Sequence, residues 1–276
     1  MNKVWLITGA GRGLGAAIAQ GALASGAQVV ATARRLENLA RYQGMAAVLP
    51  LALDVTEAEQ AEAVVGQALA RFGRIDVLVN NAGYGQLGPF EETTQAQARE
   101  QFATNVEGVF NLCRAVLPAM RAQHDGHLFN ISSMAGISAM PGSSLYCASK
   151  FAVEGFSEAL AGEVAGFGIK VTLVEPGALR TDFLDPGSAR FGTAHLEDYQ
   201  AFSARIQERC AAGNHQQGGD PERLAAAILH LATLVSPPLR FIAGSDAYGQ
   251  VTAKLQAMLD QAREWQALSA SIDYGA

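Results

Sequence analysis

The sequence is poor in cysteine and histidine, and this shortage excludes several classes of protein. Only 3 cysteines and 5 histidines occur in 276 residues. Cys113, Cys147 and Cys210 are odd in number and widely separated, which is neither a disulfide framework nor a zinc-binding pattern. The histidines show no ligand spacing either. We therefore expect reduced, buried thiols and no bound metal.

Basic clusters and long apolar runs are also scarce. The formal net charge is -6 and the longest basic cluster is the pair Arg34-Arg35, so we expect no nucleic-acid partner. No apolar run approaches the ~20 residues that a membrane span requires. The first apolar run stops at Thr8-Gly9, too early for the core of a signal peptide. We expect a cytoplasmic protein without a membrane span, folded as a single domain over residues 1–276.

Apolar runs of strand length alternate with amphipathic stretches of helix length from residue 3 to about residue 180. This alternation is typical of a parallel sheet covered by helices on both faces. It predicts an α/β protein with a doubly wound, seven-stranded parallel sheet, a Rossmann fold. The expected strands are residues 4–8, 28–33, 47–53, 77–80, 127–132, 170–174 and 239–243. The expected helices begin near Gly13, Leu36, Thr56, Thr94, Ser143 and Pro221.

Two local signals refine the helices. Thr56 and Glu59 have the spacing of a capping box, in which each side chain bonds the other residue's backbone N–H. Pro118 lies inside the long helical pattern of residues 96–122, and we expect it to kink or shorten that helix.

The first strand and the first helix are joined by a glycine-rich turn, Thr8-Gly9-Ala10-Gly11-Arg12-Gly13-Leu14-Gly15. Glycines let the backbone turn tightly and approach a pyrophosphate, whose charge is favoured at a helix N-terminus. The position of the turn, after a strand and before a helix, is the context of a dinucleotide site. The spacing of Gly9, Gly13 and Gly15 differs from the commoner G-x-G-x-x-G.

The end of the second strand indicates which dinucleotide binds. An acid there would hold the ribose 2′-hydroxyl of NAD, but the sequence has Arg34-Arg35 and no acid before Glu37. Arginine forks suit the 2′-phosphate of NADP, and Arg12 in the turn is a further cation. We predict NADP, with NAD as the alternative if Arg34 and Arg35 are a solvated helix start.

Tyr146 and Lys150 are four residues apart and would share one face of a helix. A phenol with a pKa of about 10 is a poor base at neutral pH. An ammonium at about 4 Å and an effective dielectric near 20 favours the phenolate by about 4 kcal/mol, which lowers the pKa by up to about three units. Tyr146 is thus a candidate general acid/base. The alternative is a helix start with a half-buried tyrosine and a solvated lysine head.

Taken together, these motifs resemble the short-chain dehydrogenase/reductase family over residues 4 to about 182. The matching pieces are Thr8-Gly9 with Gly13-x-Gly15, Asp54-Val55, Asn80-Asn81-Ala82-Gly83, Asn105, Ser132-Ser133, Tyr146-x-x-x-Lys150 and Pro176-Gly177 with Thr181. The resemblance implies the same fold and an alcohol dehydrogenase or carbonyl reductase activity.

The resemblance also implies roles for individual residues. Tyr146 would exchange a proton with the substrate oxygen, and Lys150 would lower the tyrosine pKa and bind the nicotinamide ribose. Ser133, or its neighbour Ser132, would hydrogen-bond the same oxygen, and Asn105 would hold a water on the proton path. The implied cofactor contacts are Thr8, Gly9, Gly11, Arg12, Gly13, Leu14 and Gly15 in the turn, Arg34 and Arg35, Asp54 and Val55 at the adenine, Asn81, Ala82 and Gly83 at the ribose, and Pro176, Gly177 and Thr181 at the nicotinamide.

Two segments lie outside this core pattern. Residues 181–219 break the alternation and are expected to form a lid over the nicotinamide. An apolar wall favours a lipophilic substrate, although the same side chains could only cover the sheet. The wall would consist of Phe183, Leu184, Phe191, Leu196, Tyr199, Phe202 and Ile206, with Met134, Ile137 and Met140.

Residues 245–276 form an extension that resembles members of the family acting on steroids and other lipophilic ketones. The apolar spacing over residues 246–271 predicts a packed amphipathic helix. The extension follows the strand through which tetramers of the family pair, so we expect a homo-oligomer, a dimer rather than a tetramer.

The sequence thus predicts an NADP-dependent oxidoreductase that interconverts a secondary alcohol and a ketone or aldehyde, with Tyr146 as general acid/base. Three alternatives stay open: the same reaction with NAD, a non-catalytic dinucleotide-sensing protein, and a lyase or epimerase using the same Tyr146 and Lys150 pair.

Overall fold

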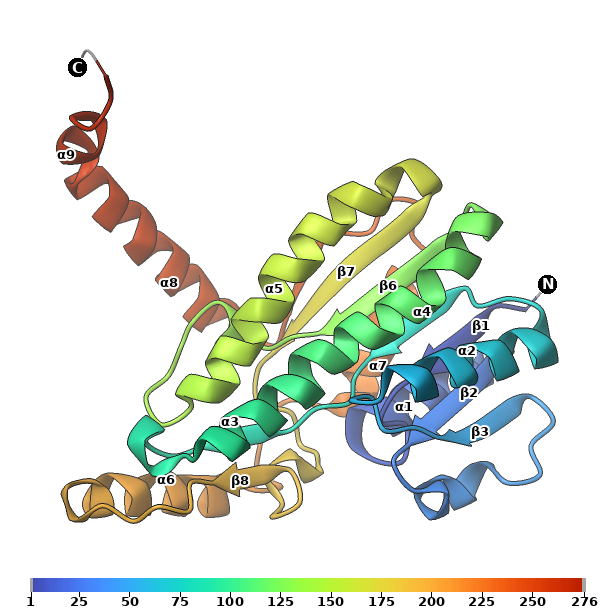
Figure 1. Ribbon diagram of the computed structural model, residues 1–276, viewed down its shortest axis with the longest axis horizontal. Helices are drawn as coiled ribbons and strands as arrows, with labels where there is room; N and C mark the ends of the chain where they lie inside the picture. Colours follow the sequence, from blue (N-terminus) through green and yellow to red (C-terminus); the bar gives the residue numbers. More distant parts are fainter. Residues whose placement is uncertain (1, 275–276) are drawn as a thin grey trace.

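The computed structural model describes residues 2–274 and contains one parallel seven-stranded sheet (Figure 1). Its spatial order is β3-β2-β1-β4-β6-β7-β9. The strands are β1 (Val4–Ile7), β2 (Gln28–Ala33), β3 (Val48–Ala52), β4 (Val77–Asn80), β6 (Gly126–Ile131), β7 (Ile169–Pro176) and β9 (Arg240–Ala243). This confirms the predicted fold class. Every residue of β1 and β4 is buried, as expected for strands covered on both faces.

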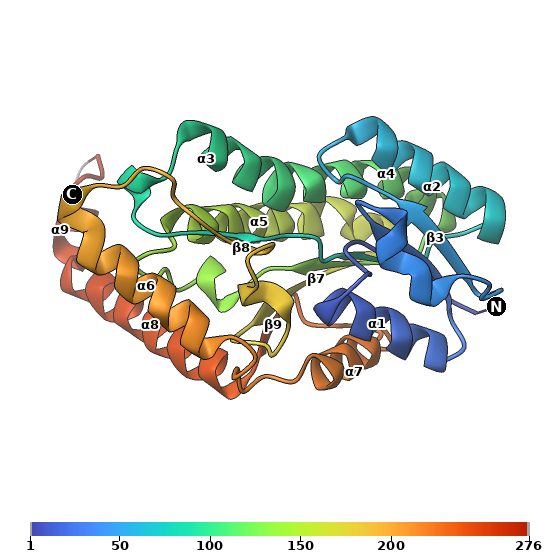
Figure 2. The same ribbon diagram turned by 90° about the horizontal axis from the view of Figure 1, so that it is seen from below.

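Helices cover both faces of the sheet, and each face has its own apolar core. Helices α1 (Gly13–Ala24) and α7 (Pro221–Leu231) lie on one face. Helices α2 (Ala58–Phe72), α4 (Gly108–Gln123) and α5 (Ser144–Val164) lie on the other, as Figure 2 shows. Strand order reverses direction between β1 and β4, so the loops at their carboxyl ends diverge and leave a crevice.

The predicted capping box is wrong. Helix α2 begins at Ala58, and the Thr56 hydroxyl donates to Asp54 Oδ1 at 2.8 Å because that carboxylate lies closer than the helix backbone. A capping box forms instead at Thr94 and Gln97, at the start of α3 (Gln95–Phe102).

The long helical pattern of residues 96–122 is interrupted earlier than expected. A π-helical turn, Ala103–Glu107, separates α3 from α4 and carries Asn105. Helix α4 continues through Pro118 to Gln123, so the proline does not shorten it. π-Helical turns such as Ala103–Glu107 are often found at functional sites. The helix expected near Leu36 is a 3₁₀ helix, Leu36–Tyr42.

The segment of residues 181–219 is folded against the rest of the chain. Its strand β8 (Ala189–Phe191) pairs in parallel with β5 (Gly85–Leu87), and α6 (Gln200–Gly213) follows. The buried Glu92 carboxylate accepts hydrogen bonds from Leu196 N at 3.1 Å and from the Ser203 hydroxyl at 2.6 Å. These bonds attach the segment to the loop that follows β5.

The chain ends in α8 (Ser245–Glu264) and α9 (Gln266–Ala270), which project away from the body (Figure 1). Ala247 and Val251 are buried, but every residue from position 253 to 274 is exposed. The predicted helix is present, but beyond its first two turns it does not pack against the rest of the described chain. Because α8 starts beyond the edge strand β9, it leaves the sheet after two turns. None of the described helices is long and apolar enough to cross a bilayer.

Candidate active site

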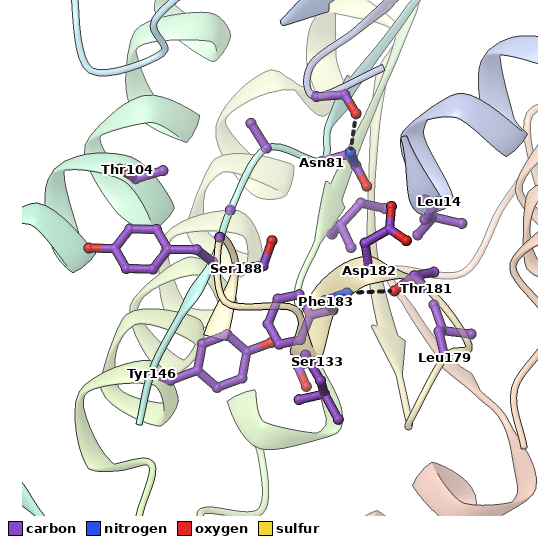
Figure 3. Close-up of a pocket in the computed structure, with 18 of the residues that line it drawn as sticks. Leu14, Asn81, Thr104, Ser133, Tyr146, Leu179, Thr181, Asp182, Phe183 and Ser188 are labelled. Atoms are coloured by element: carbon purple, nitrogen blue, oxygen red, sulfur yellow. Dashed lines mark hydrogen bonds between the residues drawn. The ribbon is translucent and has the colours of Figure 1, made fainter. Parts of the chain in front are cut away.

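A cleft of about 1380 Å³ opens at the carboxyl ends of the strands, between the glycine-rich turn, α5 and the segment of residues 181–219 (Figure 3). It brings together most of the residues selected from the sequence. Those that line it are Gly9, Gly11, Arg12, Gly13, Leu14, Arg34, Arg35, Asp54, Val55, Asn81, Ala82, Gly83, Ser133, Tyr146, Lys150, Pro176, Gly177 and Thr181. Thr8, Gly15 and Asn105 lie behind its wall and support it.

The glycine-rich turn presents backbone to the cleft. Gly9 and Gly13 have φ of +66° and +53°, a region that residues with a side chain rarely adopt. A Cβ at Gly15 would collide with the Gly9 carbonyl oxygen. The Thr8 hydroxyl accepts from the backbone N–H groups of Asn81 and Ala82, both at 2.9 Å, and so joins the ends of β1 and β4. This bare cradle at the start of α1 fits a dinucleotide pyrophosphate.

The three arginines at the adenosine end differ in their surroundings. Arg34 and Arg35 are exposed and line the rim of the cleft at the end of β2. The Arg12 side chain instead extends to residues 181–219, where Nη2 donates to Ser188 Oγ at 2.5 Å. Arg12 therefore joins the turn to this segment, a contact that the sequence did not indicate.

Tyr146, Ser133 and Lys150 meet in the wall of the cleft. Tyr146 and Ser133 lie close together, and Figure 3 shows the two residues beside Phe183. Lys150 Nζ lies 5.8 Å from the centre of the Tyr146 ring and donates to the Ile131 carbonyl at 2.8 Å. Of the two candidate serines, Ser133 has the contact with Tyr146, whereas Ser132 faces Glu154.

Burial is the main cause of the pKa shifts of Tyr146 and Lys150. It raises the pKa of Tyr146 to about 12, against which the nearby Ser133 hydroxyl acts. Burial also lowers the pKa of Lys150 to about 8, and the nearby Glu154 opposes that fall. The expected lowering of the Tyr146 pKa by Lys150 is not found in this arrangement, where burial of the phenol is the dominant effect. Tyr146 is thus a protonated phenol at neutral pH, able to donate to an oxygen in the cleft.

Asn105 holds the wall together from behind. Its Nδ2 donates to the Tyr84 carbonyl at 2.9 Å and to Ser149 Oγ at 3.2 Å, and its Oδ1 accepts from Tyr84 N at 3.1 Å. The Ser149 hydroxyl in turn donates to the Tyr146 carbonyl at 2.7 Å. The π-helical turn therefore links the loop after β4 to the first turn of α5. The water expected at Asn105 stays a prediction.

A buried acidic cluster behind Lys150 was missed by the sequence reasoning. Glu175 on β7 is fully buried, and Arg240 Nε on β9 lies 3.6 Å from it and 3.1 Å from Glu154 on α5. Burial, followed by the neighbouring Glu154, raises the pKa of Glu175 to about 8. No local pattern could have found this cluster, because its residues come from three elements that are distant in the sequence.

The remaining wall of the cleft combines apolar and polar side chains. Its apolar side chains include Leu87, Met134, Met140, Phe183, Leu184 and Ile206. Of the residues expected here, Ile137, Phe191, Leu196, Tyr199 and Phe202 do not line it. Two cations that the sequence did not indicate, Arg190 and Arg209, do. The Arg190 guanidinium stacks 4.3 Å from the Tyr84 ring centre and pairs with Glu100 at 2.9 Å.

One group of potential metal ligands occurs among residues 2–274. Ligand atoms of Asp182, Asp185 and His215 lie within 4.8 Å of one another. Hydrogen bonds account for this closeness, since Asp185 Oδ1 interacts with His215 Nε2 at 3.2 Å and accepts from Asn214 Nδ2 at 2.8 Å. We assign no metal to this group.

Comparison with known proteins places this site in a family. Residues 3–190 match the family model described as short chain dehydrogenase. The chain is 40% identical over 272 residues to Oxidoreductase BOA17 of Botryotinia fuckeliana, covering 98% of each chain. It is 41% identical over 242 residues to a 3-ketodihydrosphingosine reductase of Bacteroides thetaiotaomicron, covering 86% of each.

Solved structures agree. A short-chain dehydrogenase from Streptomyces avermitilis superposes with a TM-score of 0.90 at 42% identity, covering 99% of both chains. A Burkholderia phymatum enzyme in complex with NAD has a TM-score of 0.78 at 25% identity, covering 97% of this chain and 95% of its own. A metagenomic oxidoreductase in complex with NADP has a TM-score of 0.68 at 32% identity, covering 87% of this chain and 95% of its own.

Proposed function

Because the chain belongs to the short-chain dehydrogenase/reductase family of oxidoreductases, we propose that it is an NADP-dependent enzyme interconverting a secondary alcohol and a ketone or aldehyde. The observation that carries the proposal is that Tyr146 and Ser133 lie close together in the wall of the cleft that begins at the glycine-rich turn. A nicotinamide dinucleotide bound along that turn would supply or accept the hydride.

The reduction requires two functions from the protein. The Tyr146 hydroxyl donates a proton to the carbonyl oxygen, and the Ser133 hydroxyl donates a second hydrogen bond to the same atom. Both donors act where negative charge develops in the transition state, so they lower the barrier rather than only tighten binding. The raised pKa of Tyr146 keeps it protonated before reaction, which suits a proton donor. Lys150 would hold the cofactor ribose beside it.

Arg34 and Arg35 support NADP over NAD. Both are exposed at the rim of the cleft, where their two guanidinium groups could hydrogen-bond to a 2′-phosphate. NAD is the second candidate, and one observation favours it: Arg12, the third cation proposed for the phosphate, is bonded to Ser188.

A lipophilic ketone is the substrate class that the cleft supports. Its substrate end is walled by Met134, Met140, Phe183, Leu184 and Ile206, which exclude water from a nonpolar ligand. The name of the 41% identical Bacteroides relative also describes a reductase of a keto compound. The cytoplasmic location and the dimeric state stay predictions.

A turnover assay tests the proposal. Purified enzyme is mixed with NADPH and a carbonyl panel from short aldehydes to long-chain and steroid ketones, and loss of NADPH absorbance is followed. We expect turnover with lipophilic ketones. Tyr146→Phe should reduce kcat by about 100-fold or more while NADPH affinity changes little, since only the proton donor is removed.

Tyr274→Phe, at an exposed tyrosine far from the cleft, is the matched control and should keep full activity. Full activity of Tyr146→Phe would refute the assignment of the general acid. NADPH binding without oxidation by any carbonyl would favour a dinucleotide sensor, and conversion of a substrate without net NADPH consumption would favour a lyase or epimerase.

A further inference from the structure

Behind the wall of the cleft, α5, β7 and β9 bring three ionisable side chains together. Glu154 lies one turn after Lys150 on the same face of α5, and its carboxylate accepts from Arg240 Nε at 3.1 Å. Glu175 Oε1 lies 3.6 Å from the same nitrogen. Glu154 is 6% exposed and Glu175 is fully buried, so both carboxyls are withdrawn from water. No step of the proposed reaction uses either acid.

The cluster is packed against the cleft through Ser132 and Gly136. Ser132 lines the cleft. A Cβ at Gly136 would lie 2.7 Å from Ser132 Oγ, 3.1 Å from Glu154 Cγ and 3.2 Å from the Lys150 carbonyl oxygen. Lys150 Nζ donates to the carbonyl of Ile131, the residue before Ser132, at 2.8 Å. Glu154 therefore acts on Lys150 through packed protein rather than through water, which strengthens the electrostatic interaction between them.

Four polar atoms of the cluster have no hydrogen-bond partner among residues 2–274. They are Ser132 Oγ, Glu154 Oε1 and both carboxyl oxygens of Glu175. An ionised carboxylate without donors is costly in a buried position, so one of the two acids should hold a proton. Burial, followed by the neighbouring Glu154, raises the pKa of Glu175 to about 8. Protonated Glu175 has one O–H to donate, and Glu154, which lies close by, offers Oε1 as an acceptor.

The charges of the cluster balance only with this proton in place. Lys150 and Arg240 contribute two positive charges, and Arg240 also pairs with the exposed Glu158. With Glu175 protonated, Glu154 and Glu158 contribute two negative charges. A third negative charge, on the fully buried Glu175, would be left without compensation.

We propose that Glu154 and Glu175 hold one proton between them and that the remaining negative charge, on Glu154, keeps the Lys150 ammonium protonated. This role rests on the proposed function, in which the ammonium holds the cofactor ribose beside Tyr146. Burial lowers the pKa of Lys150 to about 8, and the nearby Glu154 opposes that fall. Because Glu154 does not line the cleft, it is a positioning residue that acts through Lys150.

The other ionisable groups around Lys150 do not supply this negative charge. Tyr146 lies on the preceding turn of α5 and is protonated at neutral pH. The turn Met134–Gly136, which packs on α5, has no ionisable side chain. Lys170 lies at the opposite end of β7 from Glu175. The ionisable side chains of α3 and of the π-helical turn, which also contact α5, are exposed: Arg99, Glu100 and Glu107.

The titration of Lys150 in the full folded chain tests the proposal. The sequence has only four lysines, so lysine labelled with ¹³C at Cε gives four NMR signals, and Lys150→Arg assigns the signal of interest. In Glu154→Gln the midpoint of the Lys150 titration should fall by about one pH unit or more relative to wild type. Glu154→Asp keeps the charge on a shorter side chain and should give a smaller fall. Glu158→Gln is the matched control and should leave the midpoint unchanged, because this exposed acid shares only Arg240 with the cluster.

Glu175→Gln separates a shared proton from two charged acids. Glutamine mimics protonated Glu175, so the Lys150 midpoint should move by less than half of the shift in Glu154→Gln. Equal shifts in the two variants would overturn the shared proton. An unchanged midpoint in Glu154→Gln, or in Glu154→Asp if the first variant does not fold, would overturn the role of Glu154. Near-ultraviolet circular dichroism reports whether each variant is folded.

This titration uses neither cofactor nor substrate, so its outcome does not depend on the proposed reaction. In the ketone assay, the alkaline limb of the kcat/KM profile of Glu154→Gln should move to lower pH by the same amount as the Lys150 midpoint. A shifted midpoint with an unmoved limb would overturn the use of this charge in the reaction. Absence of turnover by the wild-type protein with every ketone would instead refute the proposed function.

Discussion

Glu175 is a fully buried carboxyl one residue before Pro176, which lines the cleft. Neither of its carboxyl oxygens has a hydrogen-bond partner among the described residues. Arg240 lies 3.6 Å away, but its guanidinium also serves Glu154 and Glu158. One guanidinium cannot compensate three carboxylates at this depth, so the cluster favours keeping a proton on Glu175.

This residue predicts a pH dependence of stability. The pKa of Glu175 is raised to about 8 in the folded protein, so the folded state binds the proton more tightly than the unfolded one. The contribution of protonated Glu175 to the free energy of unfolding is full below about pH 4.5 and is lost as the pH rises towards about 8. Glu175→Gln, which is neutral throughout, should therefore become more stable relative to wild type between about pH 6 and pH 8, as urea unfolding at a series of pH values can measure.

Glu158→Gln is the control, because its carboxyl is largely exposed although it pairs with the same Arg240. It should follow the wild-type pH profile. Parallel profiles for Glu175→Gln and wild type would contradict the raised pKa.

At the scale of elements, the first turn of α8 is connected to the loop after β7. The Asp246 carboxylate accepts from Ala178 N and occupies the space beside Gly177, where any Cβ would collide with it. The loop of Pro176, Gly177 and Ala178 lines the cleft at the proposed nicotinamide position. The first turn of the extension therefore supports this loop.

Removing this support should weaken cofactor binding more than it slows the chemical step. Asp246→Ala leaves Ala178 N without its acceptor and opens space beside Gly177, so the loop loses one fixed position. We expect the KM for NADPH to rise about fivefold, the effect of about 1 kcal/mol, with kcat changed less than twofold.

Steady-state kinetics at saturating ketone measures both constants. Asp260→Ala, an exposed acid farther along the same helix, should leave both unchanged. An unchanged KM in Asp246→Ala would show that the loop keeps its conformation without this carboxylate.

For the whole molecule, the cleft couples cofactor binding to stability, because its lining comes from segments between residues 9 and 217 that separate on unfolding. A cofactor that binds only the folded chain at 100 times its Kd stabilises it by about 2.7 kcal/mol. In a chain of this size such a gain raises Tm by on the order of 5–10 °C.

This coupling gives a direct test of cofactor choice. At equal concentrations, NADPH should raise the Tm of the wild-type protein more than NADH does, because Arg34 and Arg35 can bind the 2′-phosphate. Arg34→Glu should abolish the difference, whereas Arg99→Glu on α3, outside the cleft, should preserve it. Scanning calorimetry measures the shifts, and a larger shift with NADH in wild type would show that the NADP prediction is wrong.

Much of the fold and of the cleft could be predicted from the sequence, because these features depend on local patterns. Buried apolar runs identified all seven strands of the sheet, since strands covered on both faces are made mostly of apolar residues. Motifs at strand ends, such as Thr8-Gly9 and Asn81-Ala82, had to meet at one edge because parallel strands place their carboxyl ends together.

The tertiary structure alone decided which side chains meet across the elements. The contact of Arg12 with Ser188 and the sharing of Arg240 by Glu154 and Glu175 both join residues whose distance depends on strand order and helix direction. The titration of Tyr146 depends mainly on the depth at which its phenol is buried. Sequence spacing records neither, since desolvation and electrostatic interaction are set by three-dimensional distance.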